Sequence, residues 1–388
     1  MAMTSRERVR AVLNHEIPDR VPVILGVSNA TGIKMKPYQR VKKLAGIDAP
    51  DNYIYEWPEL GTAKVDEQTM VRLHSDVRGV LDLFPKEVQE RNKNRKPHSH
   101  CLDDWGMGQV EIEPGVWFPS YHPLADATTI KELEDYPGWP VMDDPYRVAH
   151  VKDEAQKLAD EKQFAIMATP WLMFPLERAF GLQGMDKFLM NLAMVPDFAV
   201  AMLKKNLELC KQHMGHFLEA IGDNIDLIKI GDDLGSQDRL MISPRMYRQM
   251  LKPLHADLIR FIKERTKAKV FFHTDGDVFD LIEDFIEIGV DVLNPIQTSA
   301  GKMSDLQGLK QRYGSRLVFC GAIDTQHILP QGTPEEVRQE VRRVINILGE
   351  GGGYILASVH TIMNEVPAEN ILSMVDAVEE FGYYSLKK

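Results

Sequence analysis

Apolar and polar positions along one stretch of the chain predict a strand, a polar turn, a helix and a second strand. Residues 270–272 are apolar and β-prone, and the polar residues 273–277 interrupt them. Apolar residues then recur at helical spacing over 278–288, and Gly289 is a helix-ending signal before a second apolar run at 290–293. Two strands joined by a helix form a βαβ unit, so we expect them to be parallel.

The same succession of short apolar runs and helical segments recurs through the whole chain, without a linker or a low-complexity break. About eight strands, each followed by a helix, in a chain of 388 residues favour a single-domain (β/α)8 TIM barrel of the α/β class over residues 1–388. An open doubly wound sheet is the alternative, but the first strand is not followed by the GxGxxG fingerprint of dinucleotide-binding folds. The predicted strands lie within 21–26, 73–84, 164–170, 225–237, 270–272, 290–293, 317–324 and 354–360.

Residues 85–145 depart from this pattern, because they are rich in proline, tryptophan and charge and contain short β-like segments. We interpret them as an insertion in the barrel that forms a hairpin and a lid over its mouth. Trp171, after the strand at 164–170, is a better candidate for the mouth itself. Four aromatic residues of the insertion either wall an aromatic substrate pocket or pack together as the insertion's own core; they are Trp105, Trp117, Tyr121 and Trp139.

Composition narrows the classes of partner and compartment. Hydrophobic residues make up 44% and charged residues 27% of the chain, and the net charge of −11 gives no electrostatic case for a nucleic-acid partner. The sequence has no apolar run of about 18 residues, so we expect no membrane span, and its polar N-terminus lacks a signal-peptide core. Three scattered cysteines, Cys101, Cys210 and Cys320, fit a reduced compartment, so we expect a cytoplasmic protein.

Polar side chains gather where the predicted strands end, which is where parallel α/β folds build their sites. An aspartate at such a place often only caps the following helix, and we give that structural interpretation to Asp277 and Asp324. A barrel would bring the other polar residues together at one mouth. The whole group consists of Asp76, Asp232, Asp233, Gln237, His273, Asp275, Asn294, Gln297, Asp324 and His360.

Several stretches of the chain resemble the uroporphyrinogen decarboxylase superfamily over nearly the full length. They are TSRERVRAVLNHEIPDRVPV (4–23), SDV (75–77), GDDLGSQDRLMISPRMYRQMLKP (231–253), HTDGDVFDLIEDFIEIGVDVLNPIQ (273–297), GTPEEVRQEV (332–341) and VPAENILSMVDAV (366–378). The resemblance implies a (β/α)8 barrel, in agreement with the strand pattern. It also raises the expectation of a homodimer, since decarboxylases of this fold often dimerise.

The resemblance leaves two chemistries open. Decarboxylases of this superfamily carry an arginine-rich motif, RQAGRYLPEYR, after the first strand to hold the carboxylates of their substrate. The corresponding stretch here, VPVILGVSNATGIKMKPYQR (21–40), lacks the Arg-Gln-Ala-Gly core. A porphyrinogen with many carboxylates needs several cations. Tetrapyrrole decarboxylation is therefore the alternative, with Asp76 as the match to the catalytic aspartate of the decarboxylases.

The other branch consists of corrinoid-linked methyltransferases, some of which bind zinc through a His-x-Cys pair and a distant cysteine. His273 and Asp275 fall on the pair, and His360 falls on the distant cysteine when counted back from Pro367. The resemblance therefore implies a zinc site of His273, Asp275 and His360 with one position left open for catalysis. Without a metal, His273 would be a buried histidine and Asp275 a turn residue, and His360 would bind the substrate directly.

The change from thiolates to a carboxylate and an imidazole favours oxygen chemistry, because such ligands leave zinc a harder and stronger Lewis acid. Cleavage of a methyl ether requires the departing oxygen to be protonated or polarised by a metal. We therefore expect a methyltransferase that moves the methyl group of a small methoxylated, aromatic substrate to the cobalt(I) corrinoid of a partner protein, which is O-demethylation. Transfer from a thiol or another methyl donor, and tetrapyrrole binding without turnover, are the alternatives.

These hypotheses assign roles to the strand-end residues. Asp76, His273 and His360 are the candidate catalytic residues, and one of them would act as general acid if no metal is bound. The candidates for substrate binding are Asp232, Asp233, Gln237, Asn294, Gln297 and Trp171.

Overall fold

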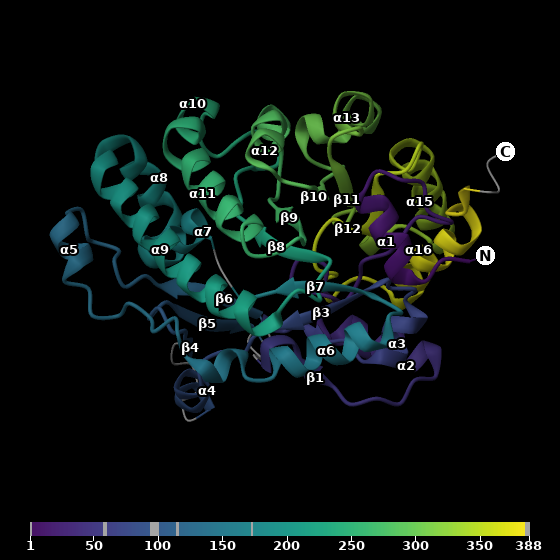
Figure 1. The fold of residues 1–388 in the computed structure, drawn as a ribbon, viewed down its shortest axis with the longest axis horizontal. Coiled ribbons are helices and arrows are strands. Elements are labelled where there is room, and N and C mark those ends of the chain that lie inside the picture. The colour runs from purple at the N-terminus through teal and green to yellow at the C-terminus, as the bar shows by residue number, and fades with distance from the viewer. Residues whose placement is uncertain (1, 57–59, 94–100, 114–115, 172–173, 385–388) are drawn as a thin grey trace.

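A parallel β-sheet forms the centre of the computed structural model, which describes residues 2–384 except 57–59, 94–100, 114–115 and 172–173. Neighbouring strands of the sheet are all parallel, and the sheet curls with its helices on the outside (Figure 1). In this part of the chain it has seven strands, which lie in the order β3 (Val77–Leu81), β7 (Ala165–Thr169), β8 (Leu227–Gly231), β9 (Lys269–His273), β10 (Val292–Ile296), β11 (Val318–Ile323) and β12 (Tyr354–Ser358).

An extended segment around Val23 closes the curled sheet between its two outer strands. Val23 forms a parallel bridge with Leu356 of β12. On its other side, the carbonyl oxygen of Val23 accepts a hydrogen bond of 2.8 Å from the backbone N–H of Asp76, which directly precedes β3. The structure thus confirms the α/β class and the (β/α)8 barrel that the sequence pattern predicts.

The first predicted strand, residues 21–26, is reduced to this isolated bridge. Pro22 has no N–H to give to a neighbouring strand. The N–H groups of Val23 and Leu25 donate instead to side chains, namely the Asp76 carboxylate at 2.8 Å and Ser75 Oγ at 3.3 Å. Side chains therefore satisfy the backbone here in place of a ladder of strand–strand hydrogen bonds.

Asp76 lies at the amino end of β3, on the side of the barrel opposite the carboxyl ends of the strands. Its carboxylate is fully buried and accepts hydrogen bonds from Arg8 Nη1 at 2.6 Å and Arg20 Nη1 at 2.8 Å, in addition to the N–H of Val23. Arg8 belongs to α1 (Ser5–Leu13), so this carboxylate joins α1 to the floor of the barrel. The structure therefore corrects the prediction that Asp76 is a catalytic residue at the mouth.

Helices cover the outside of the sheet. The longer ones are α2 (Met35–Ala45), α6 (Val151–Glu161), α7 (Pro175–Gln183), α8 (Met185–Met194), α9 (Pro196–Ile221), α11 (Lys252–Lys263), α15 (Pro334–Leu348) and α16 (Ala368–Phe381). The shorter ones are α3 (Glu67–Arg72), α4 (Lys86–Lys93), α5 (Ile130–Glu134), α10 (Pro244–Met246), α12 (Ile282–Ile288), α13 (Leu306–Tyr313) and α14 (Ile328–Gln331). As its sequence predicts, α12 ends at Gly289, whose φ of 95° suits glycine.

Several single turns and a two-stranded sheet lie outside the central sheet. The 3-10 turns are η1 (Ile54–Glu56), η3 (Pro145–Val148), η5 (Phe279–Leu281) and η6 (Gly301–Ser304), and η4 (Tyr247–Leu251) is a π-helical turn between α10 and α11. β1 (Asn52–Tyr53) and β2 (Ala63–Lys64) pair antiparallel.

Residues 85–145 contain a three-stranded antiparallel sheet of β4 (Cys101–Leu102), β5 (Gly108–Glu113) and β6 (Val116–Tyr121), at the lower left in Figure 1. The turn at 114–115 lies outside the described residues. Trp105 and Trp139 meet edge to face at 6.1 Å, and Tyr136 contacts Trp139 at 5.2 Å. Trp117 packs against the cluster around Phe84. Trp105 thus belongs to the main hydrophobic core and Trp139 packs against it, so the insertion shares its core with the barrel. The role of the insertion as a lid stays a prediction.

Buried ion pairs fasten the base of the insertion to the barrel. Arg147 lies 3.3 Å from Asp82, which follows β3, and 2.9 Å from Asp104, which follows β4. Arg178 of α7 lies 3.2 Å from Asp103. Both arginines are almost fully buried, so these contacts replace water as the partners of their charges.

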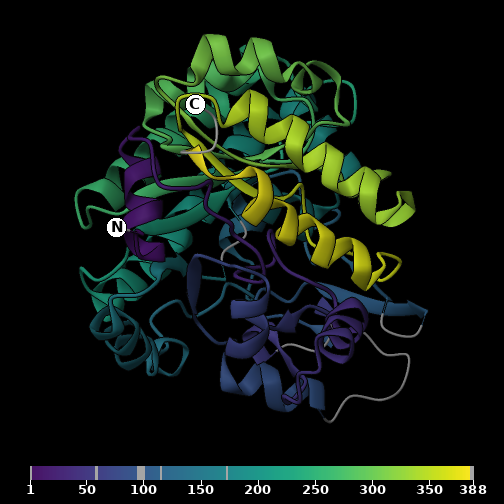
Figure 2. The ribbon, with the colours of Figure 1, turned by 90° about the vertical axis from the view of Figure 1, so that its right-hand side faces the viewer.

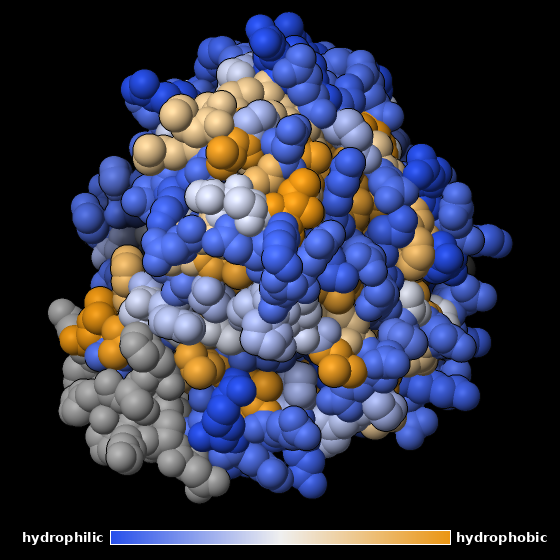
Figure 3. Space-filling view, turned by 90° about the vertical axis from the view of Figure 1, so that its left-hand side faces the viewer, coloured by the Kyte–Doolittle hydropathy of each residue, from blue (hydrophilic) through white to orange (hydrophobic). Residues whose placement is uncertain are grey.

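The two ends of the barrel face opposite sides of the molecule. α1 and α16 lie at the right in Figure 1 and toward the viewer in Figure 2. Arg6 and Arg8 of α1 bind Asp226 and Asp76, which precede β8 and β3, so this side holds the amino ends of the strands. The carboxyl ends lie on the other side of the barrel. Figure 3, which views the left-hand side of the molecule in Figure 1, shows a largely hydrophilic surface with scattered hydrophobic patches. No helix among the described residues is both long and apolar enough for a membrane span.

Replacement of Asp76 by asparagine tests its structural role. The variant leaves Arg8 and Arg20 buried without one of their counter-charges, which should lower the free energy of unfolding by about 3 kcal/mol in urea denaturation. Asp238→Asn is the control, because Asp238 pairs with Arg239 on the surface, and it should change stability by less than about 0.5 kcal/mol. If Asp76→Asn were as stable as the wild type, the structural role would be contradicted. If it were as stable but inactive, Asp76 would again be a candidate catalytic residue.

Candidate metal centre

Three side chains from two distant segments meet at the carboxyl ends of the strands. His273 is the last residue of β9, Asp275 follows it by two positions, and His360 lies two residues beyond β12. Oδ2 of Asp275 lies 3.9 Å from Nε2 of His273 and 3.7 Å from Nε2 of His360. One ligand atom from each residue can be chosen so that all three lie within 4.8 Å of one another, as a metal site requires.

The imidazole of His273 is held in one orientation by β10. Its Nδ1–H donates a hydrogen bond of 2.7 Å to Oδ1 of Asn294, which is its partner on the neighbouring strand. An amide oxygen only accepts, so the proton sits on Nδ1 and Nε2 keeps a lone pair on the side of Asp275. A hydrogen bond of this kind fixes the tautomer and the ring direction of histidine ligands in metal sites. Asn294, which we predicted to bind substrate, therefore orients His273.

Both imidazoles are held in the neutral form that binds metal ions. Burial lowers the pKa of His273 well below its usual range, and the charges of Lys229 and His360 lower it further. Burial, followed by the charges of Lys229 and Lys34, lowers the pKa of His360 to about 4. The His360 side chain nevertheless keeps 42% of its surface exposed. At neutral pH both rings therefore offer a lone pair.

Acidic side chains crowd around one lysine beside these histidines. Burial and the charge of Asp233 raise the pKa values of Glu177 and Asp275 well above their usual range. Burial also raises the pKa of Asp233 and lowers that of Lys229, whose ammonium interacts with all three carboxyls. Nζ of Lys229 donates to Oδ1 of Asn29 at 3.3 Å. Three carboxyls share one ammonium, so the local charge is negative when the carboxyls are ionised. This charge favours the binding of a cation.

His273, Asp275 and His360 fit zinc in kind and in geometry. At bond lengths of about 2.0–2.1 Å, neighbouring ligand atoms of a tetrahedral zinc site lie about 3.3–3.4 Å apart. The observed distances of 3.9 and 3.7 Å exceed this separation only modestly. Oδ1 of Asp275 is buried and has no hydrogen-bond partner among the described residues, so a cation can bind it. Two imidazoles and one carboxylate leave the fourth position open, as catalytic zinc sites do.

Comparison with known proteins assigns the chain to a family. The profile of the family described as Uroporphyrinogen decarboxylase (URO-D) matches residues 103–381, which is more than half of the chain. The chain belongs to the uroporphyrinogen decarboxylase family. This membership confirms the resemblance that the sequence motifs indicate.

Curated relatives match the chain at low identity. The uroporphyrinogen decarboxylase of Psychromonas ingrahamii is 28% identical over 191 residues, which cover 46% of this chain and 51% of that protein. The enzyme of the same name from Legionella pneumophila (strain Corby) is 25% identical over 287 residues, which cover 72% of this chain and 75% of that protein. The chain thus spans about half the length of the first of these relatives.

A solved structure shares the fold of this family member over nearly its whole length. A methyltransferase from Methanosarcina mazei superposes with a TM-score of 0.67 and covers 98% of this chain and 99% of its own. The two sequences are 20% identical. At this identity the likeness shows a common fold, and the activity has to be argued from the site.

Two glutamines and Asp233 lie beside the candidate metal centre of this family member. Oε1 of Gln297, which follows β10, accepts the N–H of Gly276 at 2.7 Å, and its Nε2 donates to Oε1 of Gln237 at 3.4 Å. Oδ1 of Asp233 accepts the backbone N–H of Asp275 at 2.9 Å. The structure therefore brings these three predicted substrate-binding residues close to the candidate metal centre.

Asp232 has a structural task instead. Its fully buried carboxylate accepts the N–H groups of Leu176 at 3.0 Å and Glu177 at 2.8 Å, at the start of α7. Nε2 of His255 lies 2.9 Å from the same carboxylate. Asp232 thus holds α7 and α11 to the end of β8, which corrects the prediction that it binds substrate.

Trp171 turns toward the insertion. The centroid of its ring lies 5.1 Å from that of Tyr55 and 5.2 Å from that of Phe84. Its backbone N–H donates a hydrogen bond of 2.6 Å to Oδ1 of Asp82. It lines a small cavity of about 80 Å³ together with residues of β4 to β6. The structure places Trp171 in this cavity, and substrate binding by its ring stays a prediction.

The sequence-based prediction missed several polar residues around the centre. Lys229 is a polar residue inside the apolar strand LIKIG (227–231), and this break in the pattern could have singled it out. Lys34 stands in the stretch where decarboxylases carry their arginine motif. Glu177 gives no such signal, because an acidic residue in the first turn of a helix is ordinary.

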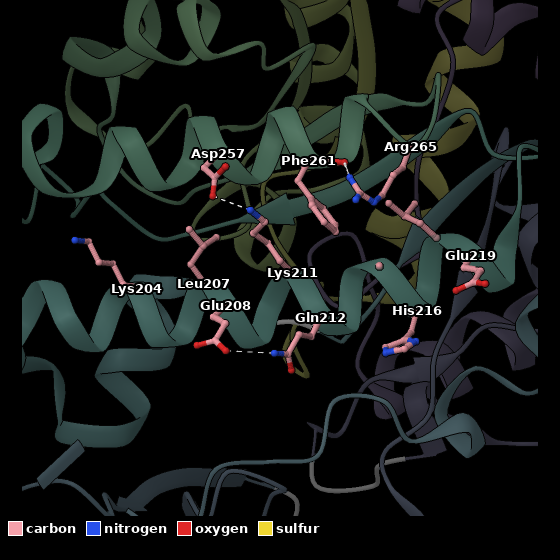
Figure 4. A pocket seen from close by; sticks show the side chains of 12 residues that line it. Lys204, Leu207, Glu208, Lys211, Gln212, His216, Glu219, Asp257, Phe261 and Arg265 are labelled. Atoms are coloured by element: carbon pink, nitrogen blue, oxygen red, sulfur yellow. Dashed lines mark hydrogen bonds and ion pairs between the residues drawn. The ribbon is translucent and has the colours of Figure 1, made fainter. Parts of the chain in front are cut away.

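A larger groove lies outside the barrel, between α9 and α11, and is separate from this centre. It has a volume of about 790 Å³, and Figure 4 shows side chains of both charges along it. Lys211 and Asp257 pair across the groove at 2.8 Å, over an apolar floor that includes Leu207 and Phe261. None of the strand-end residues lines it, so we place the candidate active site of this family member at the mouth.

Replacement of Glu177 by glutamine tests the crowding of carboxyls. Because folding raises the pKa of Glu177 above its ordinary 4.5, the stability of the wild type should fall as the pH rises from 4.5 through the raised value. The metal-free variant should therefore be more stable than the metal-free wild type at pH 8, and the difference should vanish near pH 4. Urea denaturation in chelator measures this difference. Glu134→Gln on exposed α5 is the control, and a variant less stable at pH 8 would refute the crowding.

Proposed function

We propose that this protein is a methyltransferase that moves the methyl group of a small methoxylated, aromatic substrate to the cobalt(I) corrinoid of a partner protein. The observation that carries the proposal is the meeting of His273, Asp275 and His360 at the open end of the barrel. The Methanosarcina mazei methyltransferase supports it as a case of methyl transfer on the same fold.

In this proposal, His273, Asp275 and His360 hold a zinc ion, which supplies Lewis acidity toward an ether oxygen. Two features of the structure prepare the histidines for metal binding. Asn294 fixes the ring of His273 through Nδ1, and burial keeps both imidazoles neutral. Nitrogen and oxygen ligands in place of thiolates favour an oxygen substrate over a thiol.

A proton for the departing oxygen is available beside the centre. Burial raises the pKa values of Glu177 and Asp233, so these carboxyls keep protons at a pH where ordinary carboxyls are charged. Gln237 and Gln297 present amide groups that can position a polar substrate. The leaving group would then depart as a phenol or an alcohol.

The corrinoid partner would approach the carboxyl ends of the strands, because His273 and His360 lie there. A corrinoid supplies the cobalt(I) nucleophile, and the protein has to bring the methyl carbon within reach of it. The partner therefore has to cover the mouth during transfer. The expected homodimer stays a prediction that the mass of the protein in solution can check.

Tetrapyrrole decarboxylation is the second candidate, and the relatives named uroporphyrinogen decarboxylase favour it. Such a substrate needs several cations for its carboxylates. The lysines whose charge lowers the pKa of His360 are Lys229 and Lys34, and Lys229 already interacts with three carboxyls. This shortage of free cations among the described residues near His360 favours the methyltransferase. Release of carbon dioxide from uroporphyrinogen would establish the decarboxylase instead.

Metal content and methyl transfer test the proposal together. Wild-type protein should hold one zinc ion per chain by elemental mass spectrometry and should transfer methyl groups from methoxylated aromatics to cob(I)alamin. His273→Ala and His360→Ala each remove a ligand, so zinc affinity should fall by at least about 100-fold, the upper end of the loss seen for mere supporting residues. Methyl transfer should fall with it.

His216→Ala is the matched control, because His216 is an exposed histidine of the outer groove in Figure 4. This variant should keep both zinc and activity. An active wild type without zinc would refute the metal and favour direct acid catalysis by His273 or His360. A zinc-loaded wild type that demethylates none of the methoxylated donors would refute the methyltransferase.

A further inference from the structure

Lys34 lies beside the third residue of the metal centre. Its backbone N–H donates to the carbonyl oxygen of Ile362 at 2.9 Å, and Ile33 forms a parallel bridge with the same residue. Ile362 is two residues from His360. The charge of Lys34 also contributes to the lowered pKa of His360.

The ammonium of Lys34 has no counter-charge in the part of the chain that the structure describes. Its Nζ donates to the backbone carbonyl oxygen of Leu60, and none of the described carboxylates lies within ion-pair distance. Burial lowers the pKa of Lys34. By contrast, Lys42 of the same region pairs with Asp51 at 2.6 Å.

A partly buried ammonium without a counter-charge opposes folding, because its loss of hydration is only partly replaced. Such a group in a cleft is a candidate for ligand binding. We propose that Lys34 binds a carboxylate of the methoxylated donor and so makes the protein select methoxylated acids over neutral ethers. The inference rests on the proposed function, because the methoxy group of the same molecule would lie at the metal centre.

The other charges of the mouth favour one carboxylate over a more highly charged group. The ammonium of Lys229 interacts with Glu177, Asp233 and Asp275, so it is not free for an anion. Lys34 brings a single positive charge, which a carboxylate balances. A dianionic phosphate would carry a second charge toward acidic side chains without a second cation. The donor would therefore lie with its carboxylate toward Lys34 and its ether oxygen toward the histidines.

Matched donors with and without charge separate this inference from the proposed function. The probes are the three positional isomers of methoxybenzoate and the corresponding methoxybenzamides, which have nearly the same shape but no charge. The zinc-loaded proteins are the wild type, Lys34→Met, Lys34→Arg and the control Lys36→Met, an exposed lysine in the first turn of α2. Calorimetric binding at pH 7.5 is the first readout, and kcat/KM for methyl transfer to cob(I)alamin is the second.

Lys34→Met should weaken binding of the preferred methoxybenzoate by roughly 10- to 100-fold, the size of a charge-assisted hydrogen bond, and change benzamide binding by less than about 2-fold. Lys34→Arg should keep most of the affinity because the charge is retained, and Lys36→Met should match the wild type. Equal losses for acid and amide, or no loss for the acid, would overturn the inference. Failure of the wild type to bind any of the three acids would overturn it as well.

The two proposals fail in different ways. Binding that depends on Lys34 and on the charge, without methyl transfer to any acceptor, would refute the methyltransferase and support the carboxylate site. Methyl transfer that prefers the benzamides would refute the carboxylate site and leave the methyltransferase standing. The thermal unfolding midpoint identifies a variant that does not fold. If Lys34→Met does not fold, the comparison of Lys34→Arg with the wild type tests the inference instead. Retained selectivity for the acids over the amides supports the inference, and lost selectivity refutes it.

Discussion

The balance of charge around Lys229 governs what the mouth of this barrel can hold. Three carboxyls, Glu177, Asp233 and Asp275, interact with its one ammonium where burial disfavours every charge. Carboxyls in that situation either take up protons or gather a cation. His273 stays neutral in the same surroundings, and so it adds a ligand without adding charge. A divalent ion therefore suits this environment, and the proposed ether chemistry depends on it.

The barrel and the meeting of His273, Asp275 and His360 could both be predicted from the sequence. Short apolar runs separated by helical segments predict parallel strands, and parallel topology brings the carboxyl ends of β9 and β12 to the same side. Two residues that lie far apart in the chain thus become neighbours for a reason visible in the sequence. The resemblance to a family then indicated which polar residues among many to group.

Contacts made by distant partners could not be predicted in the same way. Asp76 and Asp232 are aspartates next to strands, as Asp275 is, but Arg8 and Arg20 bind the first and His255 binds the second. The sequence around either aspartate does not indicate these partners. The same limit applies to the first predicted strand, where side chains from a remote segment take the hydrogen bonds that a neighbouring strand would otherwise supply.

The ion pairs of Arg147 and Arg178 hold the insertion at its base, close to the end of β3, while the hairpin of β5 and β6 extends beyond them. A change in the length or composition of that hairpin would leave the anchored base where it is. Relatives could therefore differ in this hairpin, and so in the proteins that they bind. The residues of the chemical centre would be unaffected by such changes.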